Sequence, residues 1–164
     1  MRRQAAYSLG EIAPNNLTAI NALVELIRNS QSESTRRQAA YSLGEIAPNN
    51  LTAINALVEL IRNSQSELTR SQAAYSLGKI APPNHSDAIT ALVDLIGNSQ
   101  SESTRMQVAE RLQDLLTESK NMAEVVIALK NYLSNEVYEV IWHCAQTMTY
   151  PAFYNACAVT PTVA

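Results

Sequence analysis

Apolar residues recur along this chain with the period of amphipathic helices. In residues 36–47 they fall on one face of a helix with about 3.6 residues per turn, and Pro48 ends the pattern. These apolar positions are Ala39, Ala40, Leu43, Ile46 and Ala47. Residues 53–62 are apolar nearly all round, which indicates a helix buried against neighbours on both sides. The pattern therefore predicts two helices joined by a short loop.

This pair of helices is repeated. Residues 2–35 and 36–69 align without a gap and differ only at Ser34 and Leu68, so the period is 34 residues. A third copy, 70–104, is one residue longer because Pro82-Pro83 stands where the earlier copies have one proline. We expect a fourth repeat at about 105–135, a capping hairpin at 136–158 and a flexible tail at 159–164. Residues 1–158 would then form a single domain.

Stacked helical hairpins bury their apolar faces only against neighbouring hairpins. The predicted fold is therefore all-α, an α-solenoid in which the repeats form a right-handed superhelix with one helix of every pair on the inner, concave surface.

Capping residues predict where the helices begin. Thr35 stands three residues before Gln38, the spacing of a capping box, and the pair recurs as Thr69/Gln72 and Thr104/Gln107. Asparagines such as Asn16 and Asn50 are the expected caps of the second helices. In the first copy Met1 takes the capping position, so we expect the chain to be a fragment of a longer array.

Composition and charge narrow the function. Twelve Lys and Arg against fifteen Asp and Glu give a net charge of −3, which argues against nucleic acid as a partner. Apolar runs are too short for a membrane span and the N-terminus does not resemble a secretory signal, so the predicted location is cytoplasmic. Cys144 and Cys157 have no CxxC spacing, and they predict buried thiols rather than a zinc site.

Catalytic signals are weak. Gly78-Lys79 lacks the upstream glycine of a phosphate-binding loop, and His143 and Cys144 point about 100° apart on a helix. Glu25, Glu59 and Asp94 recur at equivalent positions and form a solvated ladder rather than an acid–base pair. We predict no enzymatic activity, and no catalytic, cofactor or metal site.

Surface residues remain as candidates for binding a protein or peptide partner. If the second helices line the concave face, three parallel rungs form a groove, with an ordinary hydrated stripe as the alternative. The rung residues are Asn21, Glu25, Arg28, Asn55, Glu59, Arg62, Thr90 and Asp94, with Gly97 at the end of the third rung. On the first helices, Arg37 and Tyr41 above Gly44 predict a packing device, repeated at Arg3, Tyr7 and Gly10, or alternatively a binding hot spot. An apolar flank of the first repeat predicts weak end-to-end self-association.

The repeat resembles a known family. Arg-x-Gln-Ala-Ala-Tyr-Ser-Leu-Gly-Glu-Ile followed by Ala-Ile-Asn-Ala-Leu-Val-Glu-Leu-Ile is similar to HEAT-like repeats of the phycobilisome-lyase type, common in cyanobacteria, over most of residues 2–133. Tetratricopeptide repeats share the period and Leu43-Gly44, but Pro48 after a short first helix fits them poorly.

The C-terminal region carries a second resemblance. Trp142-x-Cys144-Ala145-Gln146 and Tyr150-Pro151-x-Phe153-Tyr154-x-Ala156 resemble the C-terminal helical segment of cyanobacterial NACHT-type signalling NTPases, although Cys157 stands where a tryptophan is expected. This resemblance implies a non-enzymatic interaction or scaffold module, the sensor end of a nucleotide switch. Two alternatives remain: a phycobilisome-lyase-type protein that holds a phycobiliprotein or bilin during chromophore attachment, or a spacer without a partner.

Overall fold

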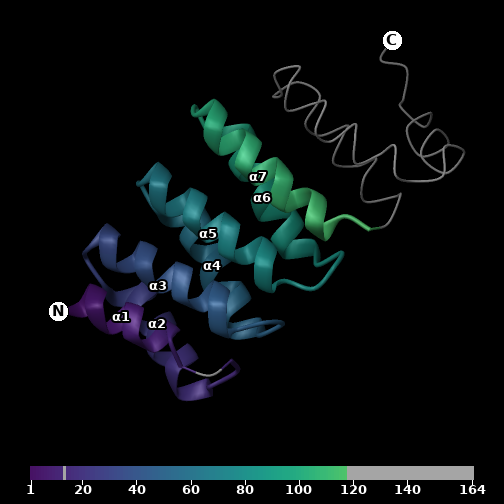
Figure 1. Cartoon of the computed structure of the whole chain (residues 1–164). Coiled ribbons are helices and arrows are strands. Elements are labelled where there is room, and N and C mark those ends of the chain that lie inside the picture. The colour runs from purple at the N-terminus through teal and green to yellow at the C-terminus, as the bar shows by residue number, and fades with distance from the viewer. Residues whose placement is uncertain (13, 118–164) are drawn as a thin grey trace, which may run out of the picture.

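The computed structural model describes residues 1–12 and 14–117, and all of the regular elements in this part of the chain are α-helices (Figure 1). The helices are α1 (Arg2–Gly10), α2 (Leu17–Asn29), α3 (Glu33–Ile46), α4 (Leu51–Asn63), α5 (Glu67–Ile80), α6 (Ser86–Asn98) and α7 (Glu102–Leu115). The predicted second helix of the fourth repeat, the capping hairpin 136–158 and the tail 159–164 lie outside the described residues.

The helices stack in two layers. The first helices of the repeats, α1, α3, α5 and α7, pack in chain order and form the first layer, and α2, α4 and α6 form the second layer (Figure 1). Each helix of the second layer also packs against the first helix of the next repeat. This arrangement confirms the predicted all-α solenoid.

The core lies between the two layers. Large side chains from both layers are almost completely buried, among them Leu43, Ile54, Leu57, Leu77 and Leu92. They belong to one hydrophobic cluster that extends from α1 to the end of α7. Because every repeat contributes to the same cluster, each repeat stabilises its neighbours.

Small residues bring the helices of the first layer close together. A Cβ built on Gly10 would lie 2.8 Å from the Cβ of Ser42, and one on Gly44 would lie 2.9 Å from the Cβ of Ser76. The Ser42 hydroxyl donates to the Ala6 carbonyl at 2.9 Å. The glycines therefore lie against serines of the next repeat.

Three of the first-layer helices, α3, α5 and α7, begin three residues earlier than predicted. Their N-caps are Ser32, Ser66 and Ser101, and the Ser32 hydroxyl accepts from the Thr35 backbone N–H at 3.3 Å. The prediction of capping boxes that begin at Thr35, Thr69 and Thr104 is therefore wrong. The earlier start is favoured because it places Glu33 in the first turn, where its carboxylate complements the helix dipole and pairs with Arg36.

The second-layer helices begin as predicted. Asn16 and Asn50 are their N-caps, and each side chain accepts from a backbone N–H three residues later at 3.0 Å. In the third repeat His85 takes this role, with its Nδ1 accepting from the Ala88 N–H at 3.4 Å. His85 therefore has a structural function at a helix start.

A feature that the sequence analysis missed joins consecutive repeats. Asn15, Asn49 and Asn84 adopt left-handed backbone conformations, with φ of 63°, 57° and 61°. Asparagine tolerates this region better than most residues. Each asparagine N–H donates to the carbonyl near the C-terminal end of the next first-layer helix: Ile46 at 2.6 Å, Ile80 at 2.8 Å and Leu115 at 2.7 Å. Each loop is thus tied to the following repeat by a backbone hydrogen bond.

Candidate protein-binding surfaces

The predicted rung residues lie on the second layer. All eight, from Asn21 to Asp94, are exposed on α2, α4 and α6. One ion pair connects two rungs, since Arg28 Nε lies 3.2 Å from Glu59 Oε2. Arg28 therefore pairs with the next repeat and not with Glu25, which accepts from Asn29 instead. An exposed pair of this kind stabilises by about 0.2–1 kcal/mol, so the stripe is only weakly organised.

The outer face of the first layer has a different chemistry. Tyr7, Tyr41 and Tyr75 occupy the same position in α1, α3 and α5, and each is 42–47% exposed. Tyr41 and Tyr75 each stand one residue before a serine that packs on a glycine of the preceding repeat, and their rings remain at the surface. We call this outer face of α1, α3, α5 and α7 the tyrosine face.

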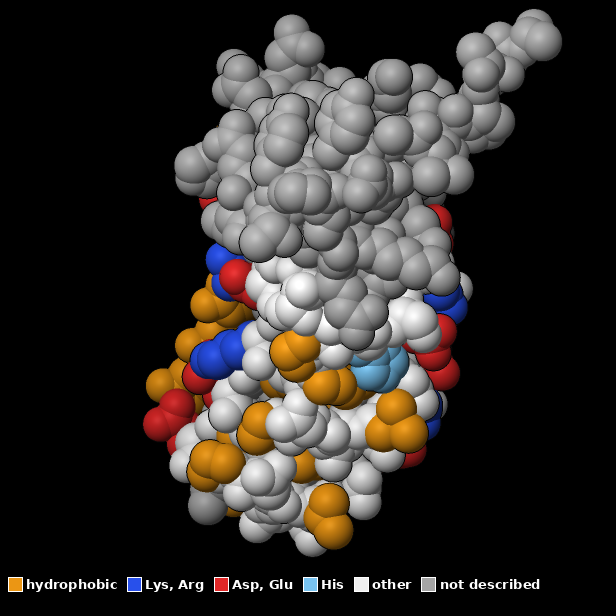
Figure 2. Space-filling view, turned by 90° about the vertical axis from the view of Figure 1, so that its right-hand side faces the viewer, with side chains coloured by type: hydrophobic (Ala, Val, Ile, Leu, Met, Phe, Trp, Pro, Cys, Tyr) orange, Lys and Arg blue, Asp and Glu red, His pale blue; other side chains and the backbone are white. Residues whose placement is uncertain are grey.

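Charged side chains accompany these aromatic rings. Figure 2 shows the molecule from the right-hand side of Figure 1. Along the left edge of the molecule in Figure 2, hydrophobic side chains lie among basic and acidic ones. On the tyrosine face, Lys79 Nζ lies 2.8 Å from Glu45 Oε2 of the preceding repeat.

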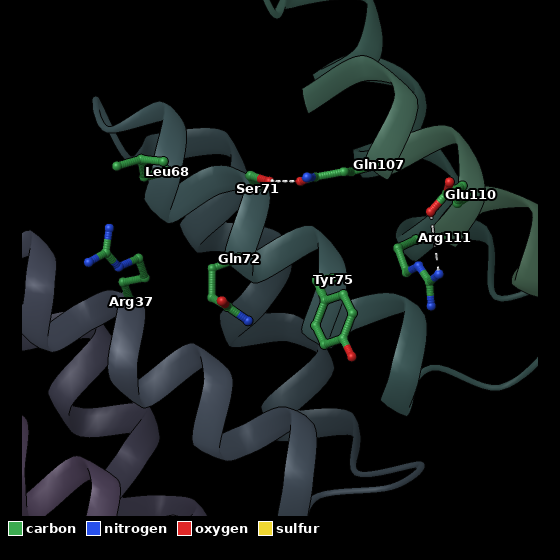
Figure 3. A pocket seen from close by; sticks show the side chains of 8 residues that line it. All are labelled: Arg37, Leu68, Ser71, Gln72, Tyr75, Gln107, Glu110 and Arg111. Carbon is green, nitrogen blue, oxygen red and sulfur yellow. Dashed lines mark hydrogen bonds and ion pairs between the residues drawn. The ribbon is translucent and has the colours of Figure 1, made fainter. Parts of the chain in front are cut away.

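A hollow on this face lies between α3, α5 and α7 (Figure 3). Its volume is about 460 Å³, and we call it the α5 hollow. Its lining residues are Arg37, Leu68, Ser71, Gln72, Tyr75, Gln107, Glu110 and Arg111. The Ser71 hydroxyl donates to Gln107 Oε1 at 3.0 Å, which joins α5 to α7 across the hollow.

The two arginines of the α5 hollow are in different environments. The Arg111 guanidinium lies 5.4 Å from the centre of the Tyr75 ring, 3.0 Å from an Asp114 carboxylate oxygen and 3.7 Å from one of Glu110. Arg37, on the other side of α5, has no carboxylate partner among the described residues. The stacking contact expected within one helix at Arg37 and Tyr41 is thus found between two repeats, at Arg111 and Tyr75.

The second hollow, of about 380 Å³, lies between α1 and α3. Tyr7 and Tyr41 line it together with Glu11, Glu45 and the apolar Ile12. The lining of this hollow has two carboxylates, of which Glu45 is paired with Lys79, whereas the lining of the α5 hollow has two arginines and one glutamate. The charged residues that line the tyrosine face therefore differ between the two hollows.

Carboxylates also hold the joints between repeats. Ser99 donates to Glu67, and Ser64 donates to the equivalent Glu33 at 3.0 Å. Burial alone would raise the pKa of Glu67, but hydrogen bonds from Ser99 and Arg70, the charge of Arg70 and a hydrogen bond from Thr104 hold the pKa below its ordinary value. Glu67 is therefore a charged residue that joins α5 to the following repeat.

In the part of the chain that the structure describes, no three His, Cys, Asp or Glu side chains come together as a metal-binding group. None of the helices there combines the length and the apolar character needed to cross a membrane. His143, Cys144 and Cys157 lie outside the described residues.

The stacked pairs of helices agree with the protein families that the sequence matches. The model of the family described as HEAT repeats matches residues 1–78 and, in a second overlapping match, residues 20–113. The chain belongs to the HEAT-repeat family. Residues 130–158 match a second family, described as NACHT C-terminal Cysteine and Histidine-containing, and this segment includes His143, Cys144 and Cys157. These matches confirm the resemblance to HEAT repeats and the resemblance to a NACHT C-terminal segment. No curated protein matches the chain.

Proposed function

We propose that this HEAT-repeat chain is a non-enzymatic module that binds a protein partner through its tyrosine face. The observation that carries the proposal is the row of Tyr7, Tyr41 and Tyr75, whose rings stay close to half exposed although the helices beneath them pack tightly. Tyrosine and arginine are the residue types that most often dominate binding energy at protein interfaces. Two hollows on the same face offer space for partner side chains.

The second-layer stripe is the weaker candidate. Its residues are polar and exposed, and one exposed ion pair gives them little fixed geometry. Side chains that are mobile in the free protein must lose entropy on binding, at about 0.5–1.5 kcal/mol each. Tyrosine has only two rotatable χ angles, so a row of tyrosines loses less.

We further propose that the module works within a NACHT-type signalling NTPase, as the part that senses a partner. The match of residues 130–158 to a NACHT C-terminal family supports this context. No phosphate-binding loop is present in the sequence, so another segment or chain would carry out the nucleotide chemistry.

Photocrosslinking in cells tests which face binds. A photoreactive phenylalanine analogue at Tyr41 should capture a partner protein, whereas the same analogue at the exposed stripe residue Asn55 should not. Capture from Asn55 and none from Tyr41 would overturn the choice of face. The NTPase context has a separate test: the gene should encode Gly-x4-Gly-Lys-Ser/Thr in frame upstream of Met1, and a gene that starts at Met1 would refute this context.

A further inference from the structure

The α5 hollow is formed largely by residues that break the repeat. Ser71 stands where the first two repeats have Arg3 and Arg37, and the shorter side chain opens space beside α5. Glu110 and Arg111 replace the tyrosine and the buried serine that precede Leu77 in α5. Arginine is too large for the buried serine position, so its side chain extends over Tyr75 at the edge of the hollow.

Leu68 is the most unusual of these departures. It is the only position at which the second repeat differs from the first, which has Ser34 there. The third repeat has Ser103 at the same position, so leucine occurs only in the second repeat. Ser34 shares a hydrogen bond of 2.9 Å with the capping Ser32, a contact that leucine cannot make. Leu68 is 67% exposed, so its side chain contributes little to the core. Leu68 therefore places an exposed apolar side chain beside the α5 hollow, where it neither caps a helix nor fills the core.

The charge in the hollow is also unbalanced. Arg111 is neutralised by Asp114 and Glu110, whereas Arg37 has no acidic partner among the described residues. Figure 3 shows Arg37 extending from α3 into the side of the hollow where Leu68 lies. A guanidinium without a carboxylate, next to an exposed leucine, complements a ligand that has an acidic group beside an apolar group.

We propose that the α5 hollow binds an acidic peptide segment of a partner protein. A carboxylate of the segment pairs with Arg37, and a neighbouring apolar side chain packs against Leu68 and Tyr75. This inference rests on the proposed function of the tyrosine face and adds to it the chemistry of the partner.

Peptide selection on the intact chain tests the inference. A phage-displayed library of random short peptides is selected against the whole protein, and the enriched peptides are labelled with fluorescein for anisotropy titration. The variants are Arg37→Gln and Leu68→Ser, the latter placing at position 68 the residue found in the other repeats. The matched controls are Arg2→Gln and Leu51→Ser, which change an exposed cation on α1 and an exposed leucine at the start of α4. Circular dichroism checks that all four variants fold.

The enriched peptides should combine Asp or Glu with an adjacent apolar residue. Arg37→Gln should weaken their binding about tenfold, as expected for loss of a charged hydrogen bond. Leu68→Ser should weaken it several-fold, and the two controls should bind as the unmodified chain does. An amide in place of the peptide carboxylate should cost about as much as Arg37→Gln, with little further loss when the two changes are combined.

Peptides without acidic residues, or affinities unaffected by Arg37→Gln, would overturn the inference. If such peptides still lost affinity on Tyr41→Ala, the tyrosine face would remain a binding surface and only its assigned ligand would be wrong. If no peptide were enriched, the α5 hollow would not be a peptide site, and the crosslinking from Tyr41 would separately decide the proposed function.

Discussion

Gly44 gives the sharpest test of how the repeats pack. Alanine has a higher helix propensity than glycine by about 1 kcal/mol, so a helix considered alone would gain stability from Gly44→Ala. In the array, however, the new Cβ would lie 2.8 Å from Ser76 Oγ, 2.9 Å from Ser76 Cβ and 3.2 Å from Ser76 Cα. These distances are too short for unbonded atoms, so α3 and α5 must move apart.

Overpacking a close interface costs about 1–3 kcal/mol, and two contacts with atoms near the backbone place this site at the upper end of that range. After subtraction of the propensity gain, Gly44→Ala should lower the free energy of unfolding by about 1–2 kcal/mol. Urea unfolding followed by circular dichroism measures this value. Asn55→Ala on the exposed stripe is the control for helix propensity and should be slightly stabilising.

A double-mutant cycle separates the steric cost from other effects. Ser76→Gly removes both of the nearest clashing atoms, so in that background Gly44→Ala should cost little or become favourable. The coupling between the two sites should be at least about 1 kcal/mol. If Gly44→Ala stabilises the protein in both backgrounds, or if the two changes are additive, the close approach of α3 and α5 described here is wrong.

Four further predictions address the caps, the loops, the pH dependence and the alternative function. Ser32→Ala should destabilise α3 by about 1 kcal/mol and Ser32→Asp should not, as measured by urea unfolding, because position 32 is the N-cap. Asn49→Ala should cost about 1–2 kcal/mol in the same assay, because alanine is strained at a φ of 57°, whereas Asn49→Gly should be nearly neutral. The Glu67 pKa is lower in the folded state than its ordinary value of 4.5, so its contribution to stability is present above pH 4.5 and is lost as the pH falls through the folded pKa. Glu67→Gln should therefore flatten the decline of the melting temperature in acid, and an unchanged decline would contradict the role of Glu67 at the joint. Incubation with a bilin and an apo-phycobiliprotein should give no covalent coloured product, and such a product would favour the lyase-type alternative.

Local periodicity was sufficient to predict the helical hairpins. The positions of Leu43 and Leu57 follow the helix period, and Pro48 marks the end of α3. The apolar period and the proline can each be recognised from a few neighbouring residues, without knowledge of the tertiary structure. The helix starts were harder because the segment before α3 contains several residues able to cap. The choice between Ser32 and Thr35 depends on Glu33, whose partner Ser64 belongs to the joint with the next repeat.

The candidate surface was only partly visible in the sequence. The sequence predicts a groove along the second-layer stripe and offers the exposed tyrosines as an alternative binding hot spot. The α5 hollow depends on Arg37, Leu68 and Arg111, which come from three helices in three repeats. Comparison of the repeats shows Leu68 as a departure, but the sequence alone does not show that Leu68 lies beside Arg37 and Arg111, because the stacking of the repeats brings these residues together.

The backbone link from each left-handed asparagine has a consequence for how the array can change in length. The link uses an N–H and a carbonyl, so it does not depend on the side chains of the surface, and the extra proline of the third loop lies before Asn84 without disturbing it. The first two repeats present almost identical surfaces to their successors. Unequal recombination that adds or removes one 34-residue unit would therefore create no new kind of interface. Such exchanges would lengthen or shorten the row of tyrosines while leaving the fold unchanged, so the gene can adjust the reach of this surface in whole repeats.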